Sequence, residues 1–282
     1  MRIRLQHRTA YIFDHPAISI IQVLRLTPRN SQGQHVRNWR VDLDQDVQML
    51  SNEDAFGNIV HNLSFSRPLD DLAVTVQGEI ETHNTHGIVR GSNERFPAGL
   101  FLRETSLTQP VPAIRKFAYD KGGKGEVLDK LHGLLDALHE EMELDPKPTG
   151  AVLTAGMAFS GGRGTPKDFA HIFITGARSL DIPARYVAGY LLTGGQGDGD
   201  QSGGWRAASH AWAEAYVDNL GWIGFDPAIG ASPEECHVRV SMALDYLGAA
   251  PLRGTYHGTS EERLDVAVLA DHADHPAFQH QQ

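Results

Sequence analysis

The segment from Pro166 to about Leu180 places the strongest constraint on the fold of this chain, because apolar residues lie on most of its sides. A helix with that pattern has no broad polar face to turn toward water, so it is buried in the centre of a domain. The sequence Asp181-Ile182-Pro183 then ends it. The surrounding chain is therefore expected to build a domain around this helix.

The start of the same helix raises a question about chemistry. It follows a glycine-rich turn, residues 162–164 (GRG), and turns of this kind often present a nucleophile at a helix start. Here Thr165 and Pro166 stand at that place, and neither Ser nor Cys does. Threonine is a good N-cap, proline suits the first helical position, and Asp168 has capping-box spacing from Thr165. The junction is an efficient helix start that lacks a thiol.

Composition excludes several classes of protein. The 282 residues are enough for one or two domains, and the formal net charge of −10 argues against nucleic acid as a partner. The single cysteine, Cys236, cannot form an intramolecular disulfide. No apolar run approaches the roughly 20 residues that span a membrane, and the N-terminus lacks the apolar core of a secretory signal. We expect a cytoplasmic protein without a membrane partner.

The pattern along the chain predicts an α+β protein. Alternating segments separated by turn residues predict an antiparallel β-sandwich over residues 1–85, and residues 86–115 read as a connecting segment. Residues 116–270 are expected to form a second, helix-then-sheet unit, beginning with a helix from Glu126 to Glu143. Residues 271–282 are expected to be a disordered tail.

Two strands of the second unit carry residues suited to catalysis. In the segment 210–216 (HAWAEAY), His210, Trp212 and Glu214 share one face, and alanines occupy the other, as close packing on a helix requires. A turn at 218–221 returns the chain toward Asp226, so the strands of His210 and Asp226 are expected to lie together; the two residues stand at unequal distances from the turn, and the sequence does not give the exact register. A histidine that takes a proton and a carboxylate that orients it would serve a nucleophile at the helix start.

These segments resemble the bacterial transglutaminase-like family. The resemblance covers nearly the whole chain and is carried by the following segments: 162–171 (GRGTPKDFAH), 182–190 (IPARYVAGY), 208–214 (ASHAWAE), 221–227 (GWIGFDP), 11–16 (YIFDHP), 24–28 (LRLTP), 54–58 (DAFGN), 245–246 (DY) and 251–254 (PLRG). It implies an N-terminal β-sandwich followed by a papain-like transglutaminase core. It also implies that His210 and Asp226 are the family's histidine and aspartate.

The same resemblance reveals a departure at Pro166, the position that the family's cysteine nucleophile occupies. Proline has no thiol, and it also has no backbone N–H, which the family is expected to use in its oxyanion hole. One such donor typically contributes about 2.7–4 kcal/mol. Ala228-Ile229 and Ala243-Leu244 also stand where the family commonly has Thr-Asn and Gly-Arg. These departures predict a catalytically inactive pseudoenzyme in which His210 and Asp226 are a vestigial base and orienter.

Other readings of the site remain open. A hydrolase, amidase or transglutaminase-type activity could survive through water or a displaced nucleophile, either Cys236 or Thr165, working with His210 and Asp226. Arg163 and Lys167 flank the helix start and are candidates to hold an anion there, and Trp212 is a further candidate ligand-binding residue. His171 is expected to be a buried, hydrogen-bonded histidine.

Neither a metal nor a cofactor is expected. The expected partner is a peptide or protein. It would bind either at the cleft that holds the active site in the family, called here the old cleft, or on the surface of the sandwich. An active paralogue or a peptide-ligase-like protein is an alternative, because such proteins often accompany the family.

Overall fold

The N-terminal part of the chain folds into antiparallel strands. The computed structural model describes residues 1–92, 94–145, 152–194, 206–257 and 262–272. The first strands are β1 (Arg2–Ala17), β2 (Ser19–Thr27), β3 (Gln34–Leu43), β4 (Leu50–Glu53), β5 (Ile59–Phe65) and β6 (Leu69–Thr82). Strands β1, β6 and β3 are neighbours in one sheet, and β2, β5 and β4 are neighbours in another. As predicted, this region is built of antiparallel sheets.

A shared apolar core joins the inward faces of these two sheets. Buried side chains alternate along β2, as a strand with one face in a core requires. The core residues are Tyr11, Phe13, Ala17, Ile20, Leu24, Leu26, Val41, Leu63, Phe65, Leu69, Leu72, Val74 and Val76. The inward positions of β2 include Gln22, the one polar member of the series Ile20, Gln22, Leu24 and Leu26.

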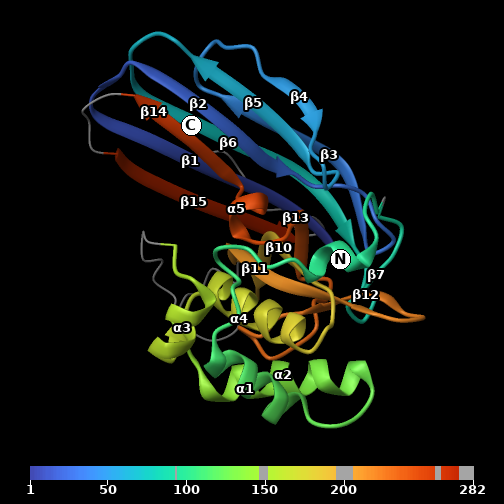
Figure 1. The fold of residues 1–282 in the computed structure, drawn as a ribbon. Helices are drawn as coiled ribbons and strands as arrows, with labels where there is room; N and C mark the ends of the chain where they lie inside the picture. The colour runs from blue at the N-terminus through green and yellow to red at the C-terminus, as the bar shows by residue number, and fades with distance from the viewer. Residues whose placement is uncertain (93, 146–151, 195–205, 258–261, 273–282) are drawn as a thin grey trace.

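The last two strands of the described chain pair with the first two. Strand β14 (Leu252–His257) pairs with β2, and β15 (Glu262–His272) pairs with β1 from Ile3↔His272 to Phe13↔Glu262. Sequence analysis places these residues in the second unit, because strand periodicity alone does not indicate a distant pairing partner. Figure 1 shows both red strands lying beside the blue ones. Residues 273–282 of the expected tail lie outside the described residues.

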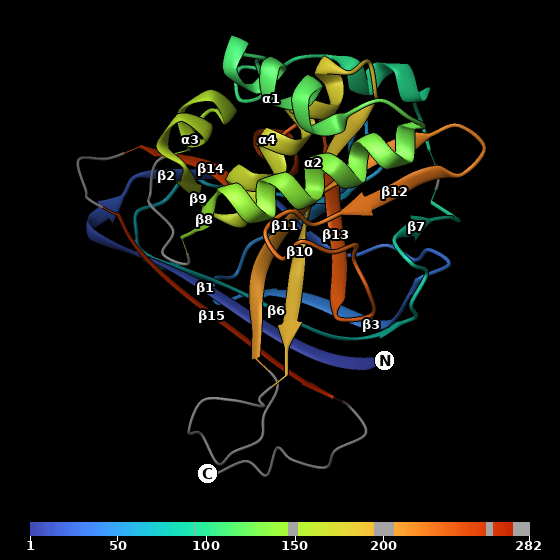
Figure 2. The ribbon, with the colours of Figure 1, turned by 90° about the horizontal axis from the view of Figure 1, so that it is seen from below.

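The second part of the chain places helices against the other end of the long sheet (Figures 1 and 2). Its helices are η1 (Ala98–Leu102), α1 (Pro112–Gly122), α2 (Val127–Glu141), α3 (Ala155–Gly161), α4 (Pro166–Ser179) and α5 (Tyr246–Ala249). Its strands are β7 (Ile88–Val89), β8 (Glu143–Leu144), β9 (Arg163–Gly164), β10 (Ala184–Thr193), β11 (Arg206–Val217), β12 (Gly221–Phe225) and β13 (His237–Ala243). The α+β class predicted from sequence is confirmed.

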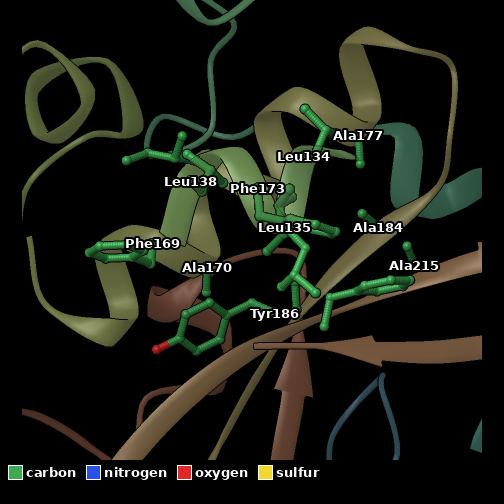
Figure 3. Packing of buried hydrophobic residues seen from close by; sticks show 14 of the residues in the cluster. Leu134, Leu135, Leu138, Phe169, Ala170, Phe173, Ala177, Ala184, Tyr186 and Ala215 are labelled. Carbon is green, nitrogen blue, oxygen red and sulfur yellow. The ribbon is translucent and has the colours of Figure 1, made fainter. Parts of the chain in front are cut away.

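Helix α4 is the predicted central helix, and it is buried from Asp168 to Arg178. Helices α1, α2 and α3 pack on one side of it, and strands β10 and β11 pack on the other. The alanine face of β11, represented by Ala215, lies in the same core as Phe173 and Leu135 (Figure 3). The small alanine side chains let the helix approach the strand closely.

The expected connecting segment contains structure of its own and is tied to α4. It includes β7 and η1, and α1 begins at Pro112, before the first helix expected from sequence. Arg178 of α4 donates from Nε to the carbonyl oxygen of Phe101, at 2.8 Å, and from Nη1 to the hydroxyl of Thr108, at 2.7 Å. This buried guanidinium holds the segment in place by bonding to polar groups that burial would otherwise leave unpaired. No helix among the described residues is long and apolar enough to cross a bilayer.

Candidate active site

Helix α4 begins as the sequence predicts, with Thr165 as N-cap and Pro166 as its first residue. The Asp168 carboxylate oxygen Oδ2 accepts hydrogen bonds from the backbone N–H of Thr165, at 2.9 Å, and from its hydroxyl, at 2.7 Å. Proline has no N–H to leave unpaired at this position, and an acidic group in the first turn suits the helix dipole. The junction is therefore a well-formed helix start, and the hydroxyl of Thr165 is already engaged with Asp168.

Strands β11 and β12 bring the predicted histidine and aspartate together. They form a hairpin in which Ala213 lies opposite Phe225, so Asp226 follows the end of β12 close to His210. His210 Nε2 and Asp226 Oδ2 are 2.5 Å apart, and the Asp226 side chain is fully buried. The described residues provide no hydrogen-bond partner for the other ring nitrogen of His210, Nδ1. The pair retains the arrangement in which a carboxylate orients an imidazole.

A second histidine, which sequence analysis did not single out, shares the same carboxylate. His237 is the first residue of β13, and its Nε2 lies 3.1 Å from Asp226 Oδ2. The other carboxylate oxygen, Oδ1, accepts the backbone N–H of Ala228 at 3.1 Å. No local spacing in the sequence links His237 to Asp226. Asp226 therefore anchors two imidazole rings.

Cys236 contacts His237 rather than taking the place of Pro166. Its Sγ lies 3.4 Å from His237 Nδ1, and the thiol, the His237 ring and the Asp226 carboxylate form a continuous chain of contacts. The backbone N–H of Glu234 also donates to His237 Nδ1, at 3.1 Å. Any role for Cys236 as a displaced nucleophile would thus use His237 as its immediate neighbour.

The cluster of His210, Asp226 and His237 has ligand atoms close enough together for a metal ion, all within 4.8 Å of one another. The hydrogen bonds around His237 do not fit that use. Because Nδ1 accepts the N–H of Glu234, the proton of the neutral ring is on Nε2, which points at Asp226. A nitrogen that carries a proton cannot ligate a metal, so the residues favour a hydrogen-bonded cluster.

The Asp226 carboxylate is held in its charged form. Burial by itself would raise its pKa, but the hydrogen bonds from His210 and His237 outweigh burial and lower the pKa below its ordinary value. A carboxyl group with a pKa lower in the folded than in the unfolded state stabilises the fold above its unfolded pKa. That stabilisation is lost as the pH falls below about 4.

Replacing Asp226 with asparagine tests this arrangement. We expect Asp226→Asn to lose about 1–3 kcal/mol of unfolding free energy at neutral pH, because one buried donor loses its acceptor. The dependence of stability on pH between about 5 and 2 should also become flatter. Urea unfolding at a series of pH values measures both effects. Asp42→Asn, at an exposed site, is the control and should change little; an unchanged stability for Asp226→Asn would contradict the assigned hydrogen bonds.

Trp212 lies beside the cluster and lines a small cavity. Its ring meets that of His237 edge to face, with centroids 5.4 Å apart. The cavity has a volume of about 70 Å³, and its wall includes Trp212, Glu214 and His237. Gly189, which pairs with His210 across the strands, leaves room for the Trp212 ring. A Cβ added to Gly189 would lie 2.7 Å from that ring and 2.1 Å from the carbonyl oxygen of Val238.

A buried ion network supports the same sheet face. The fully buried Glu214 accepts from Arg185 Nε, at 2.6 Å, and from Arg239 Nε, at 2.7 Å, and Arg185 also binds Glu94. Burial by itself would raise the pKa of Glu214, but the charges of Arg239 and Arg185 lower it to about 2. Glu214 is thus a structural anion that binds Arg185 and Arg239.

The two cations at the start of α4 have separate partners. Arg163 pairs with Asp145, at 2.9 Å, and the Nζ atom of Lys167 lies 4.7 Å from the centroid of the Tyr246 ring. A shared anion between Arg163 and Lys167 stays a prediction. His171 is buried, as expected, and its Nε2 accepts the backbone N–H of Tyr246 at 3.0 Å. Burial lowers the pKa of His171 to about 3, and Lys167 and Arg178 act in the same direction.

Two family models match the chain. Residues 3–81 match the bacterial transglutaminase-like N-terminal region, and residues 115–227 match the transglutaminase-like superfamily core. The second match includes Pro166, His210 and Asp226, and its end lies just after the aspartate. The first match lies in the N-terminal sheets and the second in the helical part, and both leave out residues 82–114 and the chain after residue 227.

The chain is also similar to individual proteins of known sequence or structure. An uncharacterised protein of Mycobacterium leprae is 29% identical over 276 residues, covering 95% of this chain and 97% of the relative. A protein-glutamine gamma-glutamyltransferase of Pseudomonas aeruginosa is 31% identical over 117 residues, covering 39% of this chain and 17% of the relative. The crystal structure of a candidate cysteine protease from Cytophaga hutchinsonii matches with a TM-score of 0.75 and 20% identity, covering 100% of this chain and 94% of that one. The last similarity is one of fold.

Proposed function

We propose, from the premise that this chain belongs to the bacterial transglutaminase-like family, that it is a pseudoenzyme that binds a peptide or protein partner. The observation that carries the proposal is Pro166 as the first residue of α4, the position that the resemblance assigns to the family's nucleophile, in a chain that keeps a hydrogen-bonded His210–Asp226 pair. Proline supplies neither the thiol for an acyl-enzyme nor a backbone N–H for an oxyanion. The helix start is kept, and the chemistry of the family is lost.

Exposed apolar side chains near the start of α4 support the binding role. Leu144 of β8 lies opposite Gly164, and Met157 lies on α3, the helix that immediately precedes β9. Met157 is 61% exposed, and Leu144 and Val152 are also exposed. Apolar side chains left in water are typical of surfaces that bind another chain when they gather around one place. The old cleft is therefore our first choice for the partner, ahead of the N-terminal sheets.

An activity assay tests the loss of catalysis. We expect the protein to show no transamidation and no hydrolysis of glutamine-containing peptides above the buffer rate, and His210→Ala to be indistinguishable from it. Turnover that His210→Ala abolishes would contradict the proposal.

A second candidate function rests on the contacts of Cys236. A thiol beside an imidazole that a carboxylate orients is the arrangement of a thiol hydrolase, and Cys236, His237 and Asp226 form such a chain. The N–H of Glu234, which already occupies Nδ1 of His237, opposes this candidate, because the ring would have to take the thiol proton on that atom. In the same assay, turnover that Cys236→Ser abolishes and His210→Ala leaves intact would establish the second candidate in place of the first.

For the partner, we propose association with an active paralogue or a peptide-ligase-like protein in the cytoplasm. Co-expression with a paralogue that has the cysteine, followed by size-exclusion chromatography, tests the interaction. We expect co-elution that Met157→Asp reduces by at least tenfold. Leu50→Asp, equally exposed on β4, is the matched control and should leave co-elution unchanged. Elution of the wild-type protein alone would count against this partner, and cell fractionation tests the compartment.

A further inference from the structure

A cavity of about 310 Å³ lies where the N-terminal sheets meet helix α5, away from the His210–Asp226–His237 cluster. Its wall is formed by β1, β2, β14 and α5, and includes Tyr11, Phe13, Gln22, Tyr246 and Tyr256. Figure 1 shows α5 at the end of β14, between the N-terminal strands and the core. Cavities of this size commonly hold small molecules.

One strand of the cavity wall lacks a side chain next to Gln22. On β14, Leu252 and Tyr256 pack against the core of the N-terminal sheets, and Gly254 lies between them. Gly254 is directly opposite Gln22 of β2. A Cβ on Gly254 would lie 2.5 Å from Gln22 Cγ and 2.5 Å from the carbonyl oxygen of Ile21. The glycine therefore leaves the space that the Gln22 side chain occupies beside the cavity.

Gln22 is polar at a position where its neighbours along the strand are apolar. Gln22 is only 6% exposed. Its side-chain oxygen, Oε1, is buried and has no hydrogen-bond partner among the described residues. A buried acceptor without a donor typically costs about 1–3 kcal/mol. Leucine at this place would avoid that cost, since the inward positions on either side are Ile20 and Leu24. An amide kept there at such a cost indicates that something supplies a donor.

Four of the twelve residues that line the cavity are aromatic, and Arg253 and Thr255 are polar members of the same wall. The rings of Phe13 and Tyr256 lie 5.2 Å apart, and Tyr246 closes the cavity toward α4. Aromatic walls favour planar apolar molecules, which stack on them or meet them edge to face. The Nζ atom of Lys167 lies over the Tyr246 ring, 4.7 Å from its centroid. The wall of the cavity therefore contacts the first turn of α4.

We propose that this cavity is a binding site for a small planar aromatic molecule that donates an N–H or O–H hydrogen bond to Gln22 Oε1. The molecule's ring lies among Phe13, Tyr246 and Tyr256, and its donor completes the hydrogen bonding of the buried amide. This proposal does not depend on the proposed partner at the old cleft. The exposed side chains proposed to bind that partner are Leu144, Val152 and Met157, and none of them lines the cavity.

Two probes of nearly the same shape test the site. Indole has an N–H donor, and 1-benzofuran has an oxygen in its place. Isothermal titration of the full chain should show that indole binds about three- to tenfold more tightly than benzofuran, the range that one net hydrogen bond supplies. Gln22→Leu should bind both probes equally. Gln6→Leu, an exposed glutamine on β1, is the control and should keep the wild-type preference.

A second measurement makes the test independent of any folding defect. Because Gln22 Oε1 has no partner in the free protein, Gln22→Leu should have a thermal unfolding midpoint equal to or above that of the wild type. The proposal is overturned if wild-type protein binds neither probe or binds both equally, or if the preference for indole survives in Gln22→Leu. A lower midpoint for Gln22→Leu would also overturn it, since the amide would then be bonded within the free protein.

Discussion

Replacing Pro166 with cysteine is expected to create a reactive thiol where the protein has none. The new residue would supply both a thiol and a backbone N–H at the first position of α4, and Thr165 and Asp168 would still start the helix. A helix N-terminus stabilises a thiolate, so the thiol should titrate below the pKa of about 8.5 of free cysteine. With Cys236→Ser in the same chain, the new thiol is the only one, and iodoacetamide alkylation as a function of pH measures its pKa.

The same variant should gain turnover if the rest of the site is intact. We expect measurable transamidation or amide hydrolysis by Pro166→Cys, and a loss of at least 100-fold on adding His210→Ala, because the family resemblance assigns His210 as the base that takes the thiol proton. Pro166→Ala restores the N–H without the thiol and should stay inert. An alkylation profile that matches a free thiol and does not respond to His210→Ala would show that His210 is not positioned as a base.

Removing the charge of Glu214 is expected to have the largest effect on stability. The side chains of Glu214 and Arg185 are both fully buried, so Glu214→Ala removes the buried carboxylate that Arg185 and Arg239 share and leaves Arg185 only the partly exposed Glu94. Breaking a buried pair in this way costs about 3–5 kcal/mol. Urea unfolding at pH 7 measures the change in free energy. The exposed pair of Lys116 and Asp120 is the control, and Asp120→Ala should cost about 0.5 kcal/mol or less.

The pH dependence gives the same prediction a second readout. The pKa of Glu214 is lowered to about 2 in the folded protein, so its contribution is fully present above its ordinary pKa, near 4.5, and is lost as the pH falls toward 2. Wild-type stability should fall across this window, and Glu214→Gln should fall less steeply. A cost below about 1 kcal/mol for Glu214→Ala would contradict the network, since Arg185 and Arg239 would then not depend on the buried carboxylate.

Local patterns predicted the elements that carry the site. Helix α4 begins at Pro166 as expected, because capping and proline chemistry are decided by neighbouring residues. The turn at 218–221 predicted that the strands of His210 and Asp226 come together, and the structure supplies the register that brings the two side chains into contact. The family resemblance pointed to the same residues, and the two family models confirm it.

The features that sequence analysis missed depend on contacts between distant segments. His237 reaches Asp226 only because β13 pairs with β10, which in turn pairs with β11. Glu94 lies in the expected connecting segment, and its pairing with Arg185 crosses between elements that share no local pattern. The sequence does not distinguish Gln22 from a polar residue on the outer face of a strand. The structure places it on the inward face, opposite Gly254. Periodicity tells which residues share a face, and only the tertiary fold tells what that face meets.

The pairing of β1 with β15 and of β2 with β14 has a consequence for how the chain folds during synthesis. Strands β1 and β2 are synthesised before their neighbours β15 and β14, so the N-terminal sheets cannot complete their hydrogen bonding until β14 and β15 have been made. The segments of the helical core, from α1 to β13, are all made in between and can pack before that moment. Contacts of such long sequence separation form slowly. Until they form, the edges of β1 and β2 are open to pairing with another nascent chain.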